Sequence, residues 1–264
     1  MRKKDLLKKV KFKKQLINNF KKAVFHYEMI KNGDRILVGF SGGKDSNSLI
    51  LLFKYFQLTS GIKFDFEVIT IHYGMKGENY EKQIKDIQKF DIKTHLFKTN
   101  IFDLAQTLRE ENSSFCSFVS RMRRGKLTEY AKKFNFNKIA LGHHLDDAAE
   151  SLMMGIIHNG VIRSLPPIYK NQHNQIILRP LIFEREKDLA KFCRINNFTP
   201  VGDEMCPGMC VGNMPRTRQK MKKLLSGIEK ENSKLFNSLR TALQNINEEA
   251  LLDKKKLKIF NKNN

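Results

Sequence analysis

Hydrophobic positions along most of the chain form two patterns, short apolar runs and longer segments with helical spacing. The apolar runs are predicted as strands over residues 36–40, 67–72, 93–98, 138–141 and 176–178. The other segments are predicted as helices over residues 44–57, 80–90, 127–134, 146–157 and 184–196. Because strands that alternate with helices are joined by crossovers, the pattern predicts an α/β fold, a parallel sheet with helices on both faces.

A basic amphipathic N-terminal helix is predicted for residues 1–30, where the apolar residues between Leu6 and Phe25 recur near helical spacing. Turn residues at 32–34 separate this segment from the first predicted strand. At the other end, the lysine- and asparagine-rich chain after Asp253 is expected to be frayed or disordered. The sequence therefore predicts a main domain between a helical extension and a basic tail.

The first predicted strand runs into residues 41–46, which read Ser-Gly-Gly-Lys-Asp-Ser, and a predicted helix follows. Paired glycines let the backbone turn tightly with its N–H groups in one concavity, and the helix adds its positive N-terminal end. Lys44 adds a full positive charge, and the two serines add hydroxyl donors. A Walker A loop is excluded, because Val38 stands where its first glycine belongs and Asp45 follows the lysine. The segment is predicted to bind phosphate, and a strand-to-helix turn without a ligand is the alternative.

A second polar cluster follows the predicted strand 138–141, where Gly142, His143 and His144 precede Asp146 and Asp147. The carboxyl ends of parallel strands meet at one edge of a sheet, so this cluster is expected close to the phosphate loop. Both carboxylates fall in the first turn of the next predicted helix, where one of them could simply cap that helix. We prefer a site in which one carboxylate and the loop aspartate hold a Mg²⁺ ion that bridges the bound phosphates.

The chain of 264 residues carries a formal net charge of +22, with a pI of about 9.8. A small domain usually carries a net charge of about 2–8 in magnitude, so the excess predicts a polyanionic partner such as nucleic acid. A lysine-rich composition that only solvates the surface is the alternative. The sequence shows no membrane-spanning run and no signal peptide, which predicts a cytosolic protein. Its four cysteines then favour free thiols, catalysis or metal binding over disulfides.

Taken together, the motifs resemble those of the tRNA 2-thiocytidine synthetase (TtcA) family, part of the PP-loop ATP pyrophosphatase superfamily, over roughly residues 15–245. In chain order the motifs are Met-Ile-Lys-Asn-Gly-Asp-Arg at 29–35, the loop at 41–46, Ser-Arg-Met-Arg-Arg-Gly at 120–125, Ala-Leu-Gly-His-His-Leu-Asp-Asp at 140–147, Leu-Arg-Pro-Leu at 178–181 and Arg-Glu-Lys-Asp at 185–188. The resemblance implies an enzyme that uses ATP and Mg²⁺ to adenylate the C2 oxygen of a cytidine in the tRNA anticodon loop. Sulfur then replaces the activated oxygen.

The resemblance also implies an organisation of the chain and roles for its residues. The expected parts are a basic helical extension over 1–30, a PP-loop ATP-binding catalytic domain over 31–225, and a C-terminal helix with a basic tail over 226–264. The residues expected to bind the nucleotide are Ser41, Gly42, Gly43, Lys44, Asp45, Ser46, His72, Gly142, His143 and Asp147. Mg²⁺ is expected at Asp45 and Asp147, with Asp146 as the weaker candidate. The tRNA backbone is expected near Arg121, Arg123 and Arg124, for which a solvated helix start is the alternative.

The cysteines depart from the family's pattern of two Cys-x-x-Cys motifs, three of whose thiolates bind an iron–sulfur cluster. The first motif reads Cys-Ser-Phe-Val from Cys116, and the second, Cys-Pro-Gly-Met-Cys from Cys206 to Cys210, is one residue longer. These three thiols could still hold a [4Fe-4S] cluster. A persulfide relay without a cluster, or buried thiols without a function, are the alternatives. Cys193 lies on the apolar face of a predicted helix and is expected in the core.

The expected catalytic residues are Lys44, Asp45, Cys116, Cys206 and Cys210. The expected partners are tRNA and a sulfur donor such as a cysteine desulfurase, with no membrane, and members of the family pair as homodimers. Two other functions remain open. One is another PP-loop tRNA-modifying enzyme, either a 2-thiouridine synthetase or a lysidine synthetase. The other is a non-catalytic RNA-binding relative, which the valine in place of the family's cysteine favours.

Overall fold

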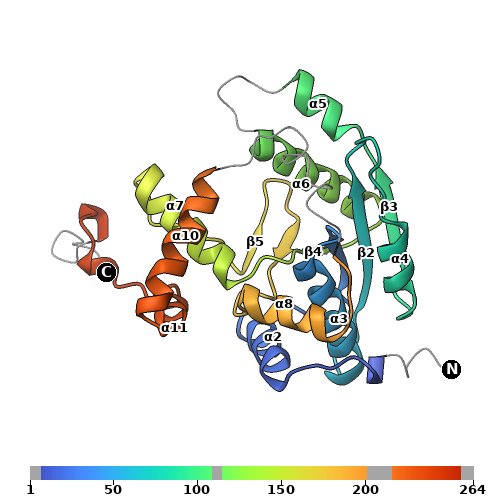
Figure 1. Cartoon of the computed structure of the whole chain (residues 1–264), viewed down its shortest axis with the longest axis horizontal. Coiled ribbons are helices and arrows are strands. Elements are labelled where there is room, and N and C mark those ends of the chain that lie inside the picture. Colours follow the sequence, from blue (N-terminus) through green and yellow to red (C-terminus); the bar gives the residue numbers. More distant parts are fainter. Residues whose placement is uncertain (1–6, 109–114, 201–215, 257–264) are drawn as a thin grey trace.

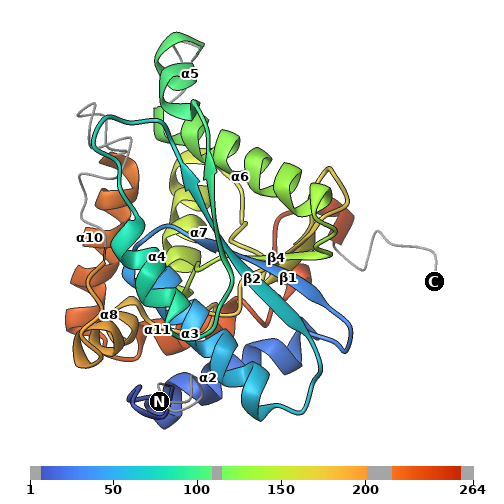
Figure 2. The same cartoon turned by 90° about the vertical axis from the view of Figure 1, so that its right-hand side faces the viewer.

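The computed structural model describes residues 7–108, 115–200 and 216–256 (Figures 1 and 2). Its strands are β1 (Arg35–Phe40), β2 (Asp65–His72), β3 (Thr94–Lys98), β4 (Lys138–Ala140), β5 (Ile168–Lys170) and β6 (Ile176–Leu178). Its α-helices are α2 (Lys14–His26), α3 (Lys44–Thr59), α4 (Glu81–Gln88), α5 (Ile101–Thr107), α6 (Phe115–Lys133), α7 (Leu145–Asn159), α8 (Glu186–Ile195), α10 (Arg216–Glu231) and α11 (Leu235–Ala242). The 3-10 helices η2 (Glu248–Ala250) and η3 (Lys254–Lys256) follow α11. None of the helices in the described ranges has the length and apolar character that a membrane crossing requires.

The six strands form one sheet in the order β3-β2-β1-β4-β6-β5. β1 pairs in parallel with β2 and β4, and Val38 lies opposite both Val68 and Ala140. The chain continues from β1 to β2 on one side, whereas β4 lies on the other side, so the ends of β1 and β4 flank a topological switch point. Ligands of open α/β sheets bind at such a point. The predicted α/β fold with a mostly parallel sheet is confirmed.

The edge strand β5 runs antiparallel to β6, in a hairpin that the sequence analysis did not predict. Asn174 adopts a positive φ of 60° in the turn, and the side chain of Asn171 accepts hydrogen bonds from the N–H groups of His173 and Gln175. Residues 176–178 were predicted as a strand, whereas residues 168–170, Ile-Tyr-Lys, contain no apolar run that would predict a partner strand. The sheet is therefore parallel except at this edge.

Helices cover both faces of the sheet (Figures 1 and 2). Alternate residues of a strand point to opposite faces, and in β1 Ile36 and Val38 pack with α2, α3 and α8, whereas Leu37 packs with α5 and α6. Helices α7, α10 and α11 form a smaller cluster around Leu145 and Phe236. The main core thus lies between the sheet and the helix that begins at the phosphate loop.

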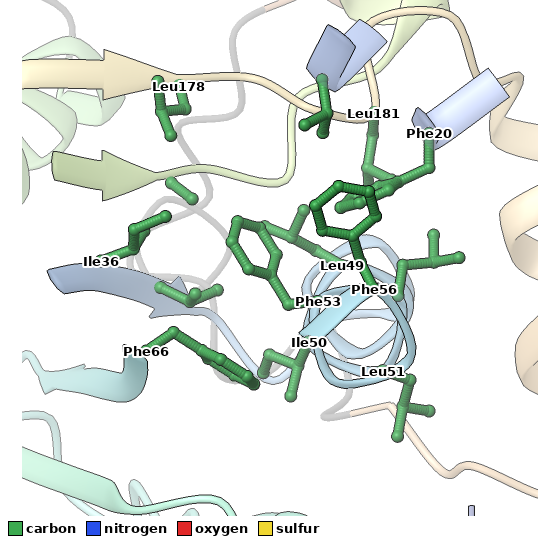
Figure 3. Packing of buried hydrophobic residues seen from close by; sticks show 14 of the residues in the cluster. Phe20, Ile36, Leu49, Ile50, Leu51, Phe53, Phe56, Phe66, Leu178 and Leu181 are labelled. Carbon is green, nitrogen blue, oxygen red and sulfur yellow. The ribbon is translucent and has the colours of Figure 1, made fainter. Parts of the chain in front are cut away.

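The core around α3 includes the N-terminal helix α2 (Figure 3). The ring of Phe20 contacts those of Phe53 and Phe56, each at a centroid distance of 5.7 Å. Leu49 and Ile50, one turn after the loop, are fully buried. A close-packed interior transmits little movement, so this packing holds the start of α3 in place.

Several element boundaries differ from the predictions. A single helix over residues 1–30 is wrong, because residues 11–13 are not helical and α2 begins only at Lys14. Helix α6 begins at Phe115, whereas the sequence predicted a helix only from residue 127. The earlier turns were missed because they contain few buried residues, and the basic residues between them obscure the helical spacing. Residues 254–256 form η3 where fraying was expected, and residues 257–264 lie outside the described residues.

The expected division into three parts stays a prediction. Helix α2 shares its core with the main domain, and position 225 falls inside the continuous helix α10.

Candidate active site

The phosphate loop joins β1 to α3 and is closed by its own hydrogen bonds. Gly42 adopts a positive φ of 81°, which a side chain would disfavour. The hydroxyl of Ser46 lies 3.1 Å from that of Ser41 and donates to the carbonyl of Gly43 at 3.0 Å. The amide of Asn47 donates to the same carbonyl, also at 3.0 Å. These internal hydrogen bonds stabilise the conformation of the loop, and the serine hydroxyls contribute to them.

The loop after β4 packs directly against the phosphate loop. A Cβ atom at Gly142 would lie 3.3 Å from the carbonyl carbon of Asp45 and 3.3 Å from the backbone nitrogen of Ser46. Such a separation is tighter than nine in ten Cβ contacts, so a side chain at this position would require one of the two loops to move by a few tenths of an ångström. The predicted proximity of the two polar clusters is confirmed.

His144 is buried at the start of α7, between the carboxylates of Asp45 and Asp147. Its Nε2 atom lies 3.8 Å from Oδ2 of Asp45 and 3.5 Å from Oδ2 of Asp147. Asp147 also caps α7, because its carboxylate accepts the N–H of His144 at 2.9 Å while Nδ1 of His144 accepts the N–H of Asp147 at 3.3 Å. The capping alternative thus describes Asp147 correctly, and the same residue faces the loop.

The two carboxylates fit a divalent cation. Oδ1 of Asp45 is buried without a hydrogen-bond partner among the described residues. Burial raises the pKa of Asp45, and the nearby charge of Asp147 adds to the rise, although His144 and Lys44 oppose it. A cation there would offset both effects, and carboxylate oxygens are ligands that Mg²⁺ prefers. Among the described residues no three His, Cys, Asp or Glu side chains are grouped to hold a metal, so the remaining ligands would be water and substrate oxygens.

Lys44 is paired with carboxylates on both sides of the loop. Its ammonium lies 3.3 Å from Asp45 and 3.0 Å from Glu186 at the start of α8. Burial alone would lower the pKa of Lys44, but these two carboxylates raise it. Glu186 in turn pairs with Lys222 of α10 at 2.6 Å, and although its burial acts in the opposite sense, the two lysines lower its pKa to about 2. Lys44 stays charged and lies at the loop, as predicted.

Helix α10 supplies a cation, Arg218, to the carboxylate of Asp147. The guanidinium of Arg218 contacts Asp147 and lies 2.7 Å from Glu150 of α7. Arg185, which precedes α8, donates to Asp146 at 3.2 Å and to Glu229 of α10 at 2.9 Å. Asp146 therefore pairs with Arg185, and its Oδ2 atom lies 3.7 Å from Nδ1 of His144. This pairing is consistent with Asp146 as the weaker candidate for a metal ligand.

His143 is a neutral imidazole held by an arginine. Its Nδ1 atom accepts a hydrogen bond from Nε of Arg179 at 3.2 Å, so the ring hydrogen is on Nε2. Burial lowers the pKa of His143, and the neighbouring guanidinium of Arg179 lowers it further. Arg179 is buried, and its guanidinium lies 4.9 Å from the ring centroid of Tyr169 in β5. The hairpin thereby fixes the histidine.

His72 ends β2 and is bound to the loop that follows it. Its Nε2 atom lies 3.2 Å from the carbonyl of Glu78, and its Nδ1 atom accepts the N–H of Gly74 at 3.1 Å. The carboxylate of Glu78 is enclosed by backbone amides, including that of Tyr73 at 2.9 Å. The described structure thus gives His72 a part in shaping this loop, and its contact with a nucleotide stays a prediction.

Helix α6 carries the predicted thiol and the three predicted RNA-binding arginines. Cys116 is half-buried near its start, and Arg123, seven residues on, lies on the same side of the helix. The charge of Arg123 acts on both His143 and Tyr80. Arg121 and Arg124 line a cleft between α6 and the β5–β6 hairpin. The contact of the three arginines with RNA stays a prediction.

Of the three remaining cysteines, only Cys193 lies within the described residues. Cys206 and Cys210 lie outside the described residues, so the predicted set of three thiols stays a prediction. Cys193 is buried in α8, and its thiol donates to the carbonyl of Lys44 at 3.2 Å. Burial raises the pKa of this thiol, which suits the predicted core position.

Sequence reasoning missed the residues that surround the loop from α8 and α10. The motif at 185–188 was recognised without a role for Glu186, and Arg218 and Lys222 were not singled out. Arg179 was likewise quoted in a motif without a function. A charge in a charged helix carries no local signal of its partner, whereas the described ion pairs join residues far apart in the chain.

A family model described as a PP-loop domain matches residues 9–206. A tRNA-cytidine(32) 2-sulfurtransferase of Geobacter sulfurreducens is 34% identical over 250 residues, which are 94% of this chain and 96% of the relative. The enzyme of the same name from Coxiella burnetii is 32% identical and covers 91% of this chain and 93% of its own length.

Among solved structures, the U34-tRNA thiolase NcsA from Methanococcus maripaludis with its [4Fe-4S] cluster has a similar fold. Its TM-score is 0.69 at 19% identity, and the match covers 89% of this chain and 80% of the other. The family model spans both the phosphate loop and the loop that begins at Gly142. The chain therefore belongs to the PP-loop family and, within it, to the family of the tRNA-cytidine(32) 2-sulfurtransferases.

Proposed function

We propose that the protein is an ATP-dependent tRNA sulfurtransferase that replaces the C2 oxygen of cytidine 32 with sulfur. The observation that carries this proposal is the pairing of the phosphate loop with Asp45 and Asp147 at the switch point of the sheet, in a chain similar over nearly its whole length to enzymes of that name. A fold likeness to a U34 thiolase at 19% identity does not favour uridine over cytidine.

The first step is adenylation of the base. The C2 oxygen attacks the α-phosphorus of ATP, an oxygen–phosphorus bond forms, and the bond to the bridging oxygen breaks to release pyrophosphate. Charge builds on the leaving pyrophosphate, where the amides of residues 41–43 and the ammonium of Lys44 would stabilise it. For this, Lys44 exchanges one of its carboxylate partners, Glu186, for a phosphate oxygen.

Asp45 and Asp147 would hold Mg²⁺, which supplies positive charge to the phosphate oxygens when it is bound. Asp147 then gives up its contact with Arg218, which retains Glu150 as a partner. His143, kept neutral by Arg179, brings an N–H donor to this region without adding a charge that would repel the cation.

The second step is the entry of sulfur. A sulfur nucleophile at the oxidation level of sulfide forms a bond to C2, and AMP leaves with the original oxygen. Cys116, Cys206 and Cys210 are proposed to deliver that sulfur in one of two ways. They would either hold a cluster that binds sulfide, or carry a persulfide on one thiol, whose terminal sulfur bonds to C2 as AMP leaves. In the second case another of these thiols attacks the inner sulfur, so that the sulfur–sulfur bond breaks, the two thiols form a disulfide and the sulfur stays on C2. A cluster with three thiolate ligands would supply an iron site for sulfur. Cys116 has the partial exposure that either role needs, and the [4Fe-4S] cluster of the fold relative NcsA supports the first.

The partners follow from the chemistry. The tRNA is the substrate, and a sulfur donor such as a cysteine desulfurase is proposed because the sulfur atom that enters at C2 must be replaced from another molecule after each turnover. We place the reaction in the cytoplasm, where its tRNA substrate is found, and we propose a homodimer on the resemblance alone.

The test is mass spectrometry of nucleosides from the bulk tRNA of a strain that lacks the gene, complemented with plasmid-borne variants. The wild-type gene is expected to restore 2-thiocytidine, and Lys44→Ala is not, because removal of one such donor typically lowers the rate by about 10²–10³. Lys54→Ala is the matched control, a lysine on the same helix whose ammonium donates to the carbonyl of Asp91 at 3.1 Å. If the deletion leaves 2-thiocytidine unchanged and removes another nucleoside, the proposed substrate is wrong.

A further inference from the structure

A cleft of about 760 Å³ lies between α6 and the β5–β6 hairpin, outside the nucleotide site. One wall is α6, and the other is the hairpin that closes the edge of the sheet. Its cationic and aromatic lining residues are Arg121, Arg124, Lys126, Tyr169, Lys170 and His173, and its other polar lining residues are Thr128, Glu129, Asn171 and Gln172. We call it the hairpin cleft.

The rim of the hairpin cleft is cationic on both sides. Arg121 and Arg124 are exposed on α6, and Lys170 is exposed on the hairpin opposite. Glu129 is the one acidic residue among the described residues that line the cleft, and the ammonium of Lys126 neutralises it at 2.8 Å. The cleft thus presents unbalanced positive charge toward any occupant.

The floor of the hairpin cleft is apolar. Leu127, Ile139, Leu141 and Ile177 line it, and all four are buried. It exists because α6 lies over β2 and β4, while the hairpin extends the sheet beyond that helix. An apolar floor within a cationic rim suits unpaired nucleotides, whose bases can lie on the floor while their phosphates meet the rim. A base-paired stem offers phosphates alone, since its bases face one another.

The hairpin cleft connects to the catalytic site through two sets of contacts. Leu141 in the floor is followed by Gly142, which packs against the phosphate loop. Tyr169 in the wall lies against Arg179, and Arg179 donates to His143 at 3.2 Å. A single strand of RNA bound in the cleft would therefore lead to the carboxyl end of β4, where the reacting base must be placed.

We propose that the hairpin cleft binds the unpaired nucleotides that flank the reacting base of the RNA substrate, with the β5–β6 hairpin as the second wall of the binding site. The proposal rests on the proposed function, which makes RNA the substrate. It assigns substrate binding to one small region of a chain whose basic residues are spread over most of its length.

The test compares two double variants with the same change in charge. The cleft variant, Arg124→Glu with Lys170→Glu, reverses one positive charge on each wall. The control variant, Lys132→Glu with Lys133→Glu, reverses two positive charges on the exposed last turn of α6, outside the cleft. Affinity for an anticodon stem-loop RNA is measured over a range of salt concentrations. The cleft variant is expected to bind at least about tenfold more weakly than the control, and the slope of log K against log salt should shrink by about 1.4, at about 0.7 per phosphate contact on a single strand.

A milder pair, Arg124→Gln with Lys170→Gln, guards against misfolding, and ATP affinity checks that the nucleotide site is intact. Equal losses in the cleft and control variants, or a fully paired duplex that competes as well as the stem-loop, would overturn the proposal. The two failures are distinguishable. Wild-type protein that binds the stem-loop but forms no 2-thiocytidine refutes the proposed function, whereas wild-type protein that thiolates tRNA while the cleft variant binds like the control refutes the cleft.

Discussion

Glu184 is a buried carboxyl group whose ionisation opposes folding. It is 1% exposed between α2 and α8, its Oε2 atom accepts a hydrogen bond from Asn19 at 3.3 Å, and its Oε1 atom has no hydrogen-bond partner among the described residues. Burial raises its pKa from 4.5 to about 8, against the lowering effect of Asn19. Glu184→Gln keeps the shape of the side chain and removes the charge.

The raised pKa of Glu184 determines how the stability of the folded protein changes with pH. Because the pKa is higher in the folded state, the favourable contribution of Glu184 is fully present below about pH 4.5 and is lost as the pH rises to about 8. One pKa unit corresponds to about 1.4 kcal/mol, so the loss between pH 5 and pH 8 is roughly 4 kcal/mol. Glu184→Gln should therefore be increasingly stabilising, relative to wild type, as the pH is raised through this window.

The assay is urea unfolding at several values from pH 5 to pH 9, with the free energy of unfolding compared between variant and wild type at each pH. Taking the difference cancels every titration that the two proteins share. Glu231→Gln, at an exposed position on α10, is the control and should give a difference that does not change with pH. A difference for Glu184→Gln that stays flat within about 1 kcal/mol would refute the reasoning, since it would mean that Glu184 ionises freely in the folded protein.

Four further changes test other parts of the structure. Gly142→Ala should weaken ATP binding about tenfold in calorimetry, since its Cβ would press on the phosphate loop; unchanged affinity would show that the loops yield. Arg218→Ala should lower the free energy of unfolding by about 1–2 kcal/mol, because Glu150 and Asp147 lose a partner; no loss would mean that water replaces it. Lys138→Met should cost about 3–5 kcal/mol, because the buried carboxylate of Asp34 loses the cation at 2.6 Å and keeps only neutral donors, the N–H of Lys31 and the amide of Asn137. Asp34→Leu added to it should recover part of that cost. Finally, anaerobically purified Cys206→Ala should contain no iron if three thiolates hold a cluster, and iron that remains in that variant would contradict the set.

The sequence predicted those parts of the site that one short segment encodes. The phosphate loop combines a strand, a pair of glycines and a helix within a few residues, so its conformation and its charge can be read together. The loop that begins at Gly142 was predicted because strand ends of a parallel sheet converge. The parallel order of the sheet follows from the same alternation of strands and helices.

The parts that the sequence did not predict depend on long-range pairing. The β5–β6 hairpin has strands of three residues, and its wall of the cleft becomes visible only when α6 lies opposite. The start of α6 was missed because a helix with few buried residues has weak periodicity. The partners of Lys44 and Asp147 were missed since no pattern shows which of many charged residues on α8 and α10 lies beside the loop.

Those long-range partners explain how the proposed site can hold charges before its substrates arrive. A lysine and two carboxylates gathered around one loop would be costly if any of them were buried without a partner. Glu186 pairs with Lys44 and also with Lys222, so it retains a cation when Lys44 turns to a phosphate.

Arg218 solves the same problem for the metal site, because it contacts Asp147 and also Glu150. When a cation occupies Asp147, Arg218 keeps its second carboxylate and no charge is stranded. The ion pairs form two groups of three residues, Lys44 with Glu186 and Lys222, and Asp147 with Arg218 and Glu150. When a substrate or a metal ion replaces one ion pair in such a group, the free-energy cost is lower than that of breaking an isolated buried pair. Because Arg218 and Lys222 both belong to α10, this helix contributes to the proposed nucleotide site although it lies far from both loops in the sequence.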